Sequence, residues 1–136
     1  MVYLLLAICA YVSAGGIKFL LNCFFARTLN FKAIGLGGMP STHNSITSSM
    51  LFYIALSEGM NNSGFGVMLA VALIVAIDSL DTRNKIGKQT KALQSMFAND
   101  PQIQSLRTKT GHNITEVIVA YALGLALAYG VFCLQQ

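Results

Sequence analysis

Two polar turns in this chain each place a histidine at the start of an apolar segment. The first runs from Gly37 to Asn44 (Gly-Gly-Met-Pro-Ser-Thr-His-Asn) and carries His43; the second runs from Thr110 to Glu116 and carries His112. These are the only two histidines among the 136 residues. Because imidazole serves both as a nucleophile and as a general acid or base near neutral pH, we interpret the turns as two halves of one active site.

His112 and Glu116 stand four residues apart. On a helix this spacing puts the carboxylate one turn from the imidazole, where it can accept a hydrogen bond, fix the tautomer and favour the cation. The same sequence fits a purely structural role, because Asn113 and Glu116 match a capping box. In the same way, Ser41 or Thr42 could simply cap the helix that begins there and have no catalytic role. Spacing alone leaves both alternatives open.

Two histidines, a carboxylate and several cations suit phosphoryl transfer through a covalent phosphohistidine. One imidazole would attack phosphorus, and the other would protonate the departing alkoxide. The transferring group spreads negative charge over its oxygens, so arginine, lysine and backbone N–H groups at helix starts are natural partners for it. This scheme needs no metal and no cofactor.

The segments that must position these turns are apolar enough to cross a membrane. Of the residues, 54% are hydrophobic and 10% are charged, whereas soluble domains average about 25% charged. A helix of about 20 apolar residues spans a bilayer core. We predict an all-α, polytopic membrane helix bundle, a single domain over 1–136. We expect about four transmembrane helices, at about 2–29, 41–57, 65–81 and 113–134, and a polar basic loop with an amphipathic helix at 82–112.

Basic residues gather on one side of this predicted bundle. Six of the nine lie between Arg83 and Lys109, on the face that also receives both histidines if the spans alternate in direction. By the positive-inside rule this face is cytoplasmic, although cations recruited to bind phosphate would imitate the signal. We therefore expect a bacterial-type inner or plasma membrane protein whose active face is toward the cytoplasm.

Two helix faces within the apolar segments are also informative. Lys18 and Asn22 share a face of the first segment and either point into a polar interior or let Lys18 extend to the membrane interface. Residues 120, 124 and 128 of the last segment are alanine, glycine and alanine. Such a small-residue stripe predicts close packing against a neighbouring helix.

Three sequence blocks together carry a resemblance to a known family. They are Gly37–His43, then Asp78-x4-Arg83 followed by Gly87-Lys88-Gln89, then Gly111-His112-x3-Glu116-Val117. The chain thereby resembles the divergent branch of the type-2 phosphatidic acid phosphatase superfamily, which is related to acid phosphatases and vanadium haloperoxidases. The resemblance implies that His112 is the nucleophile, that Glu116 orients it, and that His43 is the acid for the leaving group.

The chain departs from the wider superfamily pattern of K-x6-R-P, P-S-G-H and S-R-x5-H-x3-D blocks. Thr42 stands in place of glycine, Glu116 in place of aspartate, and Leu106 in place of arginine, and no K-x6-R-P block precedes Pro40. The phosphate-binding cations must then come from elsewhere. We expect them, in order of preference, to be Arg83, Lys32, Arg107 and Lys109. Other candidates for contact with the substrate phosphate are Gly38, Ser41, Thr42, Asp78 and Lys88.

The resemblance implies a metal-independent phosphatase acting on a lipid phosphomonoester or diphosphate. Phosphatidylglycerol phosphate, phosphatidic acid and an isoprenoid diphosphate all fit. The incomplete blocks leave open a non-catalytic membrane subunit of the same fold that binds lipid headgroups. Lys85, Lys88 and Lys91 would be attracted to anionic membrane lipids. We expect no nucleic-acid partner, and we expect a homodimer because four short spans bury little surface.

Overall fold

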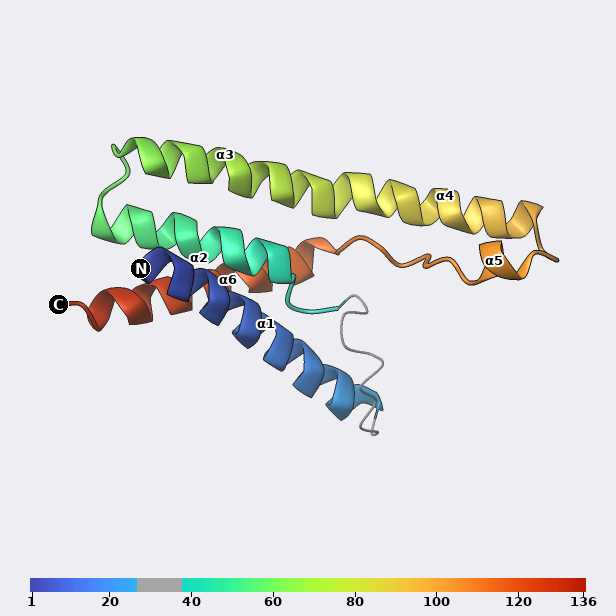
Figure 1. Cartoon of the computed structure of the whole chain (residues 1–136), viewed down its shortest axis with the longest axis horizontal. Helices are drawn as coiled ribbons and strands as arrows, with labels where there is room; N and C mark the ends of the chain where they lie inside the picture. Colours follow the sequence, from blue (N-terminus) through green and yellow to red (C-terminus); the bar gives the residue numbers. More distant parts are fainter. Residues whose placement is uncertain (27–37) are drawn as a thin grey trace.

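All regular structure in the described part of the chain is helical. The structure, a computed structural model, describes residues 1–26 and 38–136. Its elements are α1 (Val2–Ala26), α2 (Thr42–Ser57), α3 (Ser63–Ile77), the π-helical turn η2 (Asp78–Thr82), α4 (Arg83–Met96), α5 (Pro101–Gln104) and α6 (Ile114–Cys133). Helices α1, α2, α3 and α6 lie together as a bundle, and both chain ends lie at the same end of it (Figure 1). The predicted all-α fold is confirmed.

The centre of the bundle is α2, which packs against α6, α1 and α3. Helices α2 and α6 approach closely at Gly124 of α6, where an added Cβ would lie 2.0 Å from Ser48 Oγ. Ser48 Oγ donates a hydrogen bond to the carbonyl of Ala120 at 3.3 Å, and Ala120 and Ala128 are fully buried. The predicted small-residue stripe therefore is the α6 surface that receives the hydroxyl-rich helix α2.

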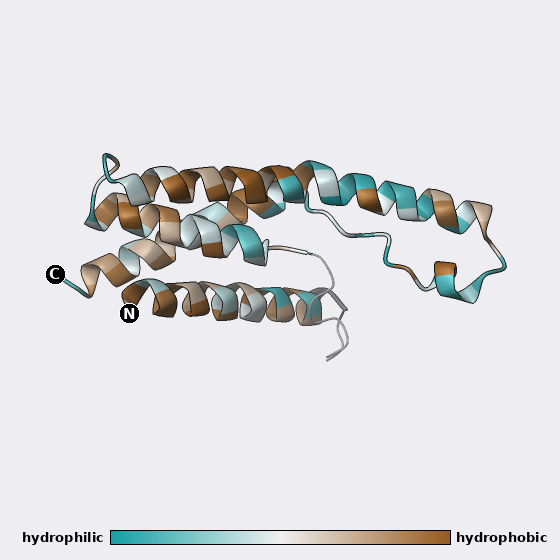
Figure 2. Ribbon diagram, turned by 45° about the horizontal axis from the view of Figure 1, so that its top comes forward, coloured by the Kyte–Doolittle hydropathy of each residue, from teal (hydrophilic) through white to brown (hydrophobic). Residues whose placement is uncertain are grey.

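Among the described residues, three helices are long and apolar enough to cross a membrane, namely Val2–Phe24, Ser63–Met96 and Ile114–Cys133. Large apolar side chains such as Leu20 and Ile74 point outward from them, and Figure 2 shows the apolar colouring of α3 giving way to polar residues along α4. A polytopic helical membrane bundle is thus confirmed. Helix α2 is shorter, at 16 residues, and rich in serine, so its crossing of the membrane stays a prediction.

Helices α3 and α4 form one continuous rod through η2, with 34 residues from Ser63 to Met96. At about 1.5 Å per residue the rod is about 50 Å long and exceeds the apolar core of a bilayer, about 30 Å. Its α4 part extends beyond the bundle (Figure 1). Within the predicted basic loop at 82–112, the rod therefore continues as α4, which is the expected amphipathic helix, and the short helix α5 follows at Pro101–Gln104.

The chain returns from the tip of the rod to α6 through residues 105–113, which we call the return segment. It runs beside α4 toward the bundle (Figure 1). At the crossing point, a Cβ on Gly87 would lie 2.3 Å from the carbonyl oxygen of Thr108. The glycine of the Gly87-Lys88-Gln89 block thus lets the return segment lie against the rod, and the segment delivers His112 to the start of α6.

Candidate active site

His112 is held rigidly at the junction between the return segment and α6. Its Nδ1 lies 2.6 Å from Glu116 Oε2, and both side chains are 9% exposed. Its backbone N–H donates to the carbonyl of Ser79 at 2.9 Å, and its own carbonyl accepts from Asn84 Nδ2 at 3.0 Å. The imidazole is therefore fixed by α6 through its ring and by the rod through its backbone.

Glu116 makes both contacts that its spacing allowed. The same carboxylate oxygen that faces His112 also accepts the backbone N–H of Asn113 at 3.3 Å, as expected for a residue at the third position of a capped helix. Capping and histidine contact are thus not alternatives here. The cap holds the carboxylate in the position from which it contacts the ring.

Both histidines line one cavity of about 260 Å³ at the junction of α1, α2 and the return segment. His43 reaches it from the first turn of α2, and His112 from the start of α6. The remaining lining residues are Tyr11, Lys18, Thr42, Ile46 and Arg107. We call this cavity the candidate site.

The charged groups around the candidate site lie within electrostatic range of one another. The charges of Arg83, Lys18 and Asp78 all act on His43. The charges of Glu116 and Arg107 act on the ammonium group of Lys18. The site therefore combines histidines and cations from three parts of the chain that are distant in sequence, namely α1, α2 and the return segment.

Lys18 points inward from α1 instead of extending to the membrane interface. Its Nζ donates to Thr42 Oγ1 at 3.3 Å, so the first of the two alternatives for this lysine is correct. Lys18 was not among the cations that we expected to bind the substrate phosphate. The available signal was a lysine in the interior of an apolar span, which is a functional hypothesis by default.

Arg83 is paired within its own sequence block. Its Nε donates to Asp78 Oδ2 at 2.6 Å, and the two side chains are 38% and 37% exposed. Its carbonyl accepts the hydroxyl of Thr110 from the return segment. Arg83 does not line the candidate site, although its charge acts on His43. The Asp78-x4-Arg83 block thus places a cation within electrostatic range of His43.

Ser41 is fully buried and its polar groups are engaged inside the protein. Its hydroxyl accepts from Asn44 Nδ2 at 2.9 Å, and its backbone N–H donates to the carbonyl of Glu116 at 3.3 Å. Asn44 also donates to Ser79 Oγ at 3.1 Å. These bonds join α2, α6 and the rod, and nothing in the sequence marked Asn44 or Ser79 for this role.

The other predicted phosphate-contacting residues fall in different places. Thr42 and Arg107 line the candidate site. Gly38, which adopts a positive φ of 118°, precedes α2 and is not among the lining residues. Lys88 and Lys109 line a separate cavity between α4 and the return segment. Lys32 lies outside the described residues.

Within residues 1–26 and 38–136, no three histidine, cysteine, aspartate or glutamate side chains gather as a metal-binding group. The cysteines in this part, Cys9, Cys23 and Cys133, are free thiols.

Comparison with known proteins gives two matches. The sequence profile of the Divergent PAP2 family matches residues 2–127. The chain is also similar to the "Uncharacterized membrane protein YuiD" of Bacillus subtilis (strain 168). The two are 26% identical over an alignment of 147 positions, which covers 93% of each chain. No solved structure matches.

Proposed function

The chain belongs to the Divergent PAP2 family, and on that premise we propose that it is a membrane phosphatase that hydrolyses a lipid phosphate. The observation that carries the proposal is the arrangement of the two histidines around one cavity. His112 is backed by a buried carboxylate at 2.6 Å, and His43 enters the same cavity from another helix. A nucleophile supported by a carboxylate and a separate acid are the two groups that phosphohistidine chemistry needs.

In the first step of the proposed reaction, Nε2 of His112 attacks the phosphorus of the bound ester. Nδ1 carries the proton that Glu116 accepts as a hydrogen bond, so Nε2 is the nitrogen with a free electron pair. The P–N bond forms as the P–O bond to the lipid breaks. His43, protonated, gives its proton to the departing oxygen, and the lipid leaves as an alcohol, or as a lipid monophosphate when the substrate is a diphosphate.

In the second step a water molecule attacks the phosphohistidine. His43, now neutral, accepts a proton from this water as its oxygen bonds to phosphorus. The P–N bond breaks, its electron pair returns to Nε2 of His112, and inorganic phosphate is released. Both histidines regain their starting protonation states, and the reaction consumes one water per ester.

Lys18 and Arg107 are the cations that we assign to the substrate phosphate. Both line the cavity with the two histidines, and cations placed there stabilise the charge that spreads over the phosphoryl oxygens. Arg107 directly follows Leu106, the position where the superfamily pattern has arginine. Lys18 contributes a charge from α1, in a chain that has no K-x6-R-P block.

The position of the cavity beside the helices α1 and α2 supports a lipid substrate. Its lining combines the polar groups with Tyr11 of α1 and Ile46 of α2, so a phosphate could be bound while its lipid tail stays in the bilayer. A phosphomonoester such as phosphatidylglycerol phosphate or phosphatidic acid, or an isoprenoid diphosphate, fits this arrangement.

The test is phosphate release by the purified protein in lipid nanodiscs, using these three lipids and vanadate as an inhibitor. Wild-type protein should hydrolyse at least one, and His112→Ala and His43→Ala should lose this activity while retaining the helical circular dichroism spectrum. Glu58→Gln is the control, because it removes a charge from the end of α2 away from the histidines. Normal phosphate release by His112→Ala would rule out the mechanism. Lipid binding without hydrolysis by any of the proteins would favour the non-catalytic headgroup-binding subunit.

We further infer that the candidate site faces the cytoplasm and that the protein forms a homodimer. In a cysteine-free variant, Gln136→Cys should then react with an impermeant maleimide in intact cells, and Gln102→Cys only after permeabilisation. The reverse pattern would invert the orientation. Native mass spectrometry from nanodiscs should show the mass of two chains, and a monomer would contradict the dimer.

A further inference from the structure

A second cavity, of about 540 Å³, lies between α4 and the return segment. Four lysines line it, and the only acidic residue among its lining side chains in the described chain is Asp81. Four lysines against one aspartate leave a net formal charge of three positive units. We call this cavity the basic cleft; its lysines are Lys85, Lys88, Lys91 and Lys109.

One of these lysines already has a partner. Lys85 Nζ lies 2.7 Å from Asp81 Oδ2, and both side chains are more than half exposed. The concentration of positive charge therefore rests on Lys88 and Lys91 on α4 and Lys109 on the return segment. These three come from the two walls of the basic cleft and would repel one another unless an anion lay between them.

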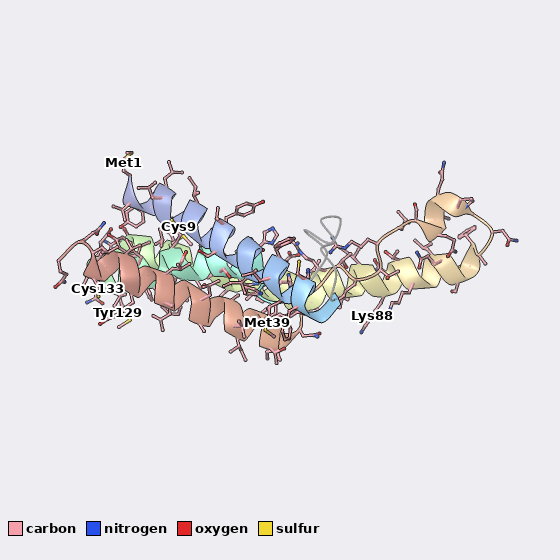
Figure 3. The ribbon with its side chains drawn as sticks, turned by 90° about the horizontal axis from the view of Figure 1, so that it is seen from below. Met1, Cys9, Met39, Lys88, Tyr129 and Cys133 are labelled. Carbon is pink, nitrogen blue, oxygen red and sulfur yellow. The ribbon has the colours of Figure 1, made fainter. Side chains whose placement is uncertain are left out.

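The length of the rod places the basic cleft at the membrane surface. An apolar core of about 30 Å takes about 20 residues of helix, so a rod that enters the core near Ser63 leaves it near Thr82. The lysines on α4 follow directly, on the part of the rod that extends beyond the bundle, where Figure 3 shows Lys88. This is the depth of the lipid headgroups.

The return segment contributes to both cavities. Arg107 and His112 line the candidate site, whereas Lys109, Gly111 and Asn113 line the basic cleft. Gly111 packs tightly here, since a Cβ on it would lie 2.2 Å from Asn84 Oδ1 on the rod. The residues on either side of His112 thus form a wall of the basic cleft.

We propose that the basic cleft binds the phosphate headgroup of an anionic membrane lipid, and that the bound headgroup holds the return segment against α4. The headgroup would join Lys88 and Lys91 on one wall to Lys109 on the other. The lipid tails would lie beside the rod, next to exposed apolar residues of α3 such as Ile77. This binding does not depend on the phosphatase chemistry proposed above.

Native mass spectrometry of the detergent-purified protein tests the binding with phosphatidylglycerol against phosphatidylcholine. Phosphatidylglycerol is a phosphodiester, so the proposed reaction would not consume it. The wild-type protein should bind it preferentially. Each lysine near an anionic membrane surface contributes about 1 kcal/mol, so Lys88→Gln with Lys109→Gln should weaken binding on the order of 30-fold. Both side chains are exposed, and the core is untouched.

A charge-balanced variant separates the basic cleft from general attraction to anionic lipid. It adds Gln89→Lys and Gln102→Lys to the two substitutions, which restores the net charge at exposed positions that do not line the cleft. It should bind as weakly as the neutralised variant. Wild-type affinity in this variant would overturn the proposal. His112→Ala should bind normally, and loss of binding there would place the lipid in the candidate site instead.

Two further measurements complete the test. Inorganic phosphate at the same concentration should neither bind with comparable affinity nor displace the lipid; if it does, the basic cleft is a site for free anions. Hydrogen–deuterium exchange of residues 107–113 should be slower in nanodiscs that contain phosphatidylglycerol than in phosphatidylcholine alone. Unchanged exchange in this segment would refute the claim that the headgroup holds it.

Discussion

Replacing Glu116 with glutamine removes one negative charge from behind His112 and leaves the size of the side chain unchanged. The glutamine carbonyl can still accept a hydrogen bond from Nδ1 of the ring and from the backbone N–H of Asn113, which lie 2.6 Å and 3.3 Å from the present carboxylate oxygen. Glutamine is also acceptable at this position of a capping box. The substitution therefore tests the charge and little else.

The size of the effect follows from the geometry of the buried pair. When His112 becomes phosphorylated its ring is positively charged, and two unit charges about 4 Å apart interact by about 4 kcal/mol at the effective dielectric of proteins. The neutral hydrogen bond that glutamine retains recovers about 1 kcal/mol. Since about 1.4 kcal/mol corresponds to a factor of ten in rate, kcat should fall by about 10²- to 10³-fold.

The assay is steady-state phosphate release in nanodiscs with the best substrate from the lipid panel. Both kcat and kcat/KM should fall for Glu116→Gln, because the lost interaction is made mainly in the transition state. Glu58→Gln removes a carboxylate far from the histidines and should leave both constants unchanged. If a folded Glu116→Gln variant retained activity within threefold of wild type, the carboxylate would not support the nucleophile, and its role would be capping alone.

Three further predictions concern other parts of the bundle. In the first turnover, His43→Ala should fail to release the alcohol of a lipid ester yet still release p-nitrophenol from p-nitrophenyl phosphate, whose leaving group needs no acid; equal losses in the first turnover would contradict its role as the acid. Lys18→Met should lower kcat/KM by about 10- to 100-fold, as expected when a hydrogen bond to a charged group is lost, and an unchanged value would remove it from the site. Gly124→Ala should lower the free energy of unfolding by about 1–3 kcal/mol through overpacking. Gly130→Ala is the control and should not lower this free energy, because nothing lies within 4 Å of the added Cβ. Equal Tm values for the two variants in thermal unfolding would refute the packing argument.

Much of the framework could be predicted because it depends on local pattern. The apolar segment expected at 113–134 corresponds to helix Ile114–Cys133, since length and hydropathy define membrane helices well. The segment expected at 41–57 corresponds to helix Thr42–Ser57. The i, i+4 spacing of His112 and Glu116 predicted their contact, although His112 precedes the N-cap residue Asn113 and so lies just outside α6. The stripe centred on Gly124 likewise depends on helix period alone.

Features that depend on tertiary contacts could not be predicted in the same way. The direction of Lys18 is decided by Thr42 across the α1–α2 contact, and no local signal distinguishes that from extension to the interface. The burial of Ser41 reflects bonds to Asn44 and to the α6 backbone. The separation of Lys109 from Arg107 into two cavities requires knowledge of how the return segment lies on the rod.

The most direct test of the proposed chemistry is to trap the phosphoenzyme. Protein mixed with a ³²P-labelled lipid phosphate, quenched within milliseconds and digested, should give a labelled peptide containing His112, with the acid-labile and base-stable behaviour of phosphohistidine. His43→Ala should still form it with an activated phenyl phosphate, because the acid is dispensable for that leaving group. Phosphate release by wild-type protein with no label on His112, or with label on another residue, would contradict the assignment of His112 as the nucleophile.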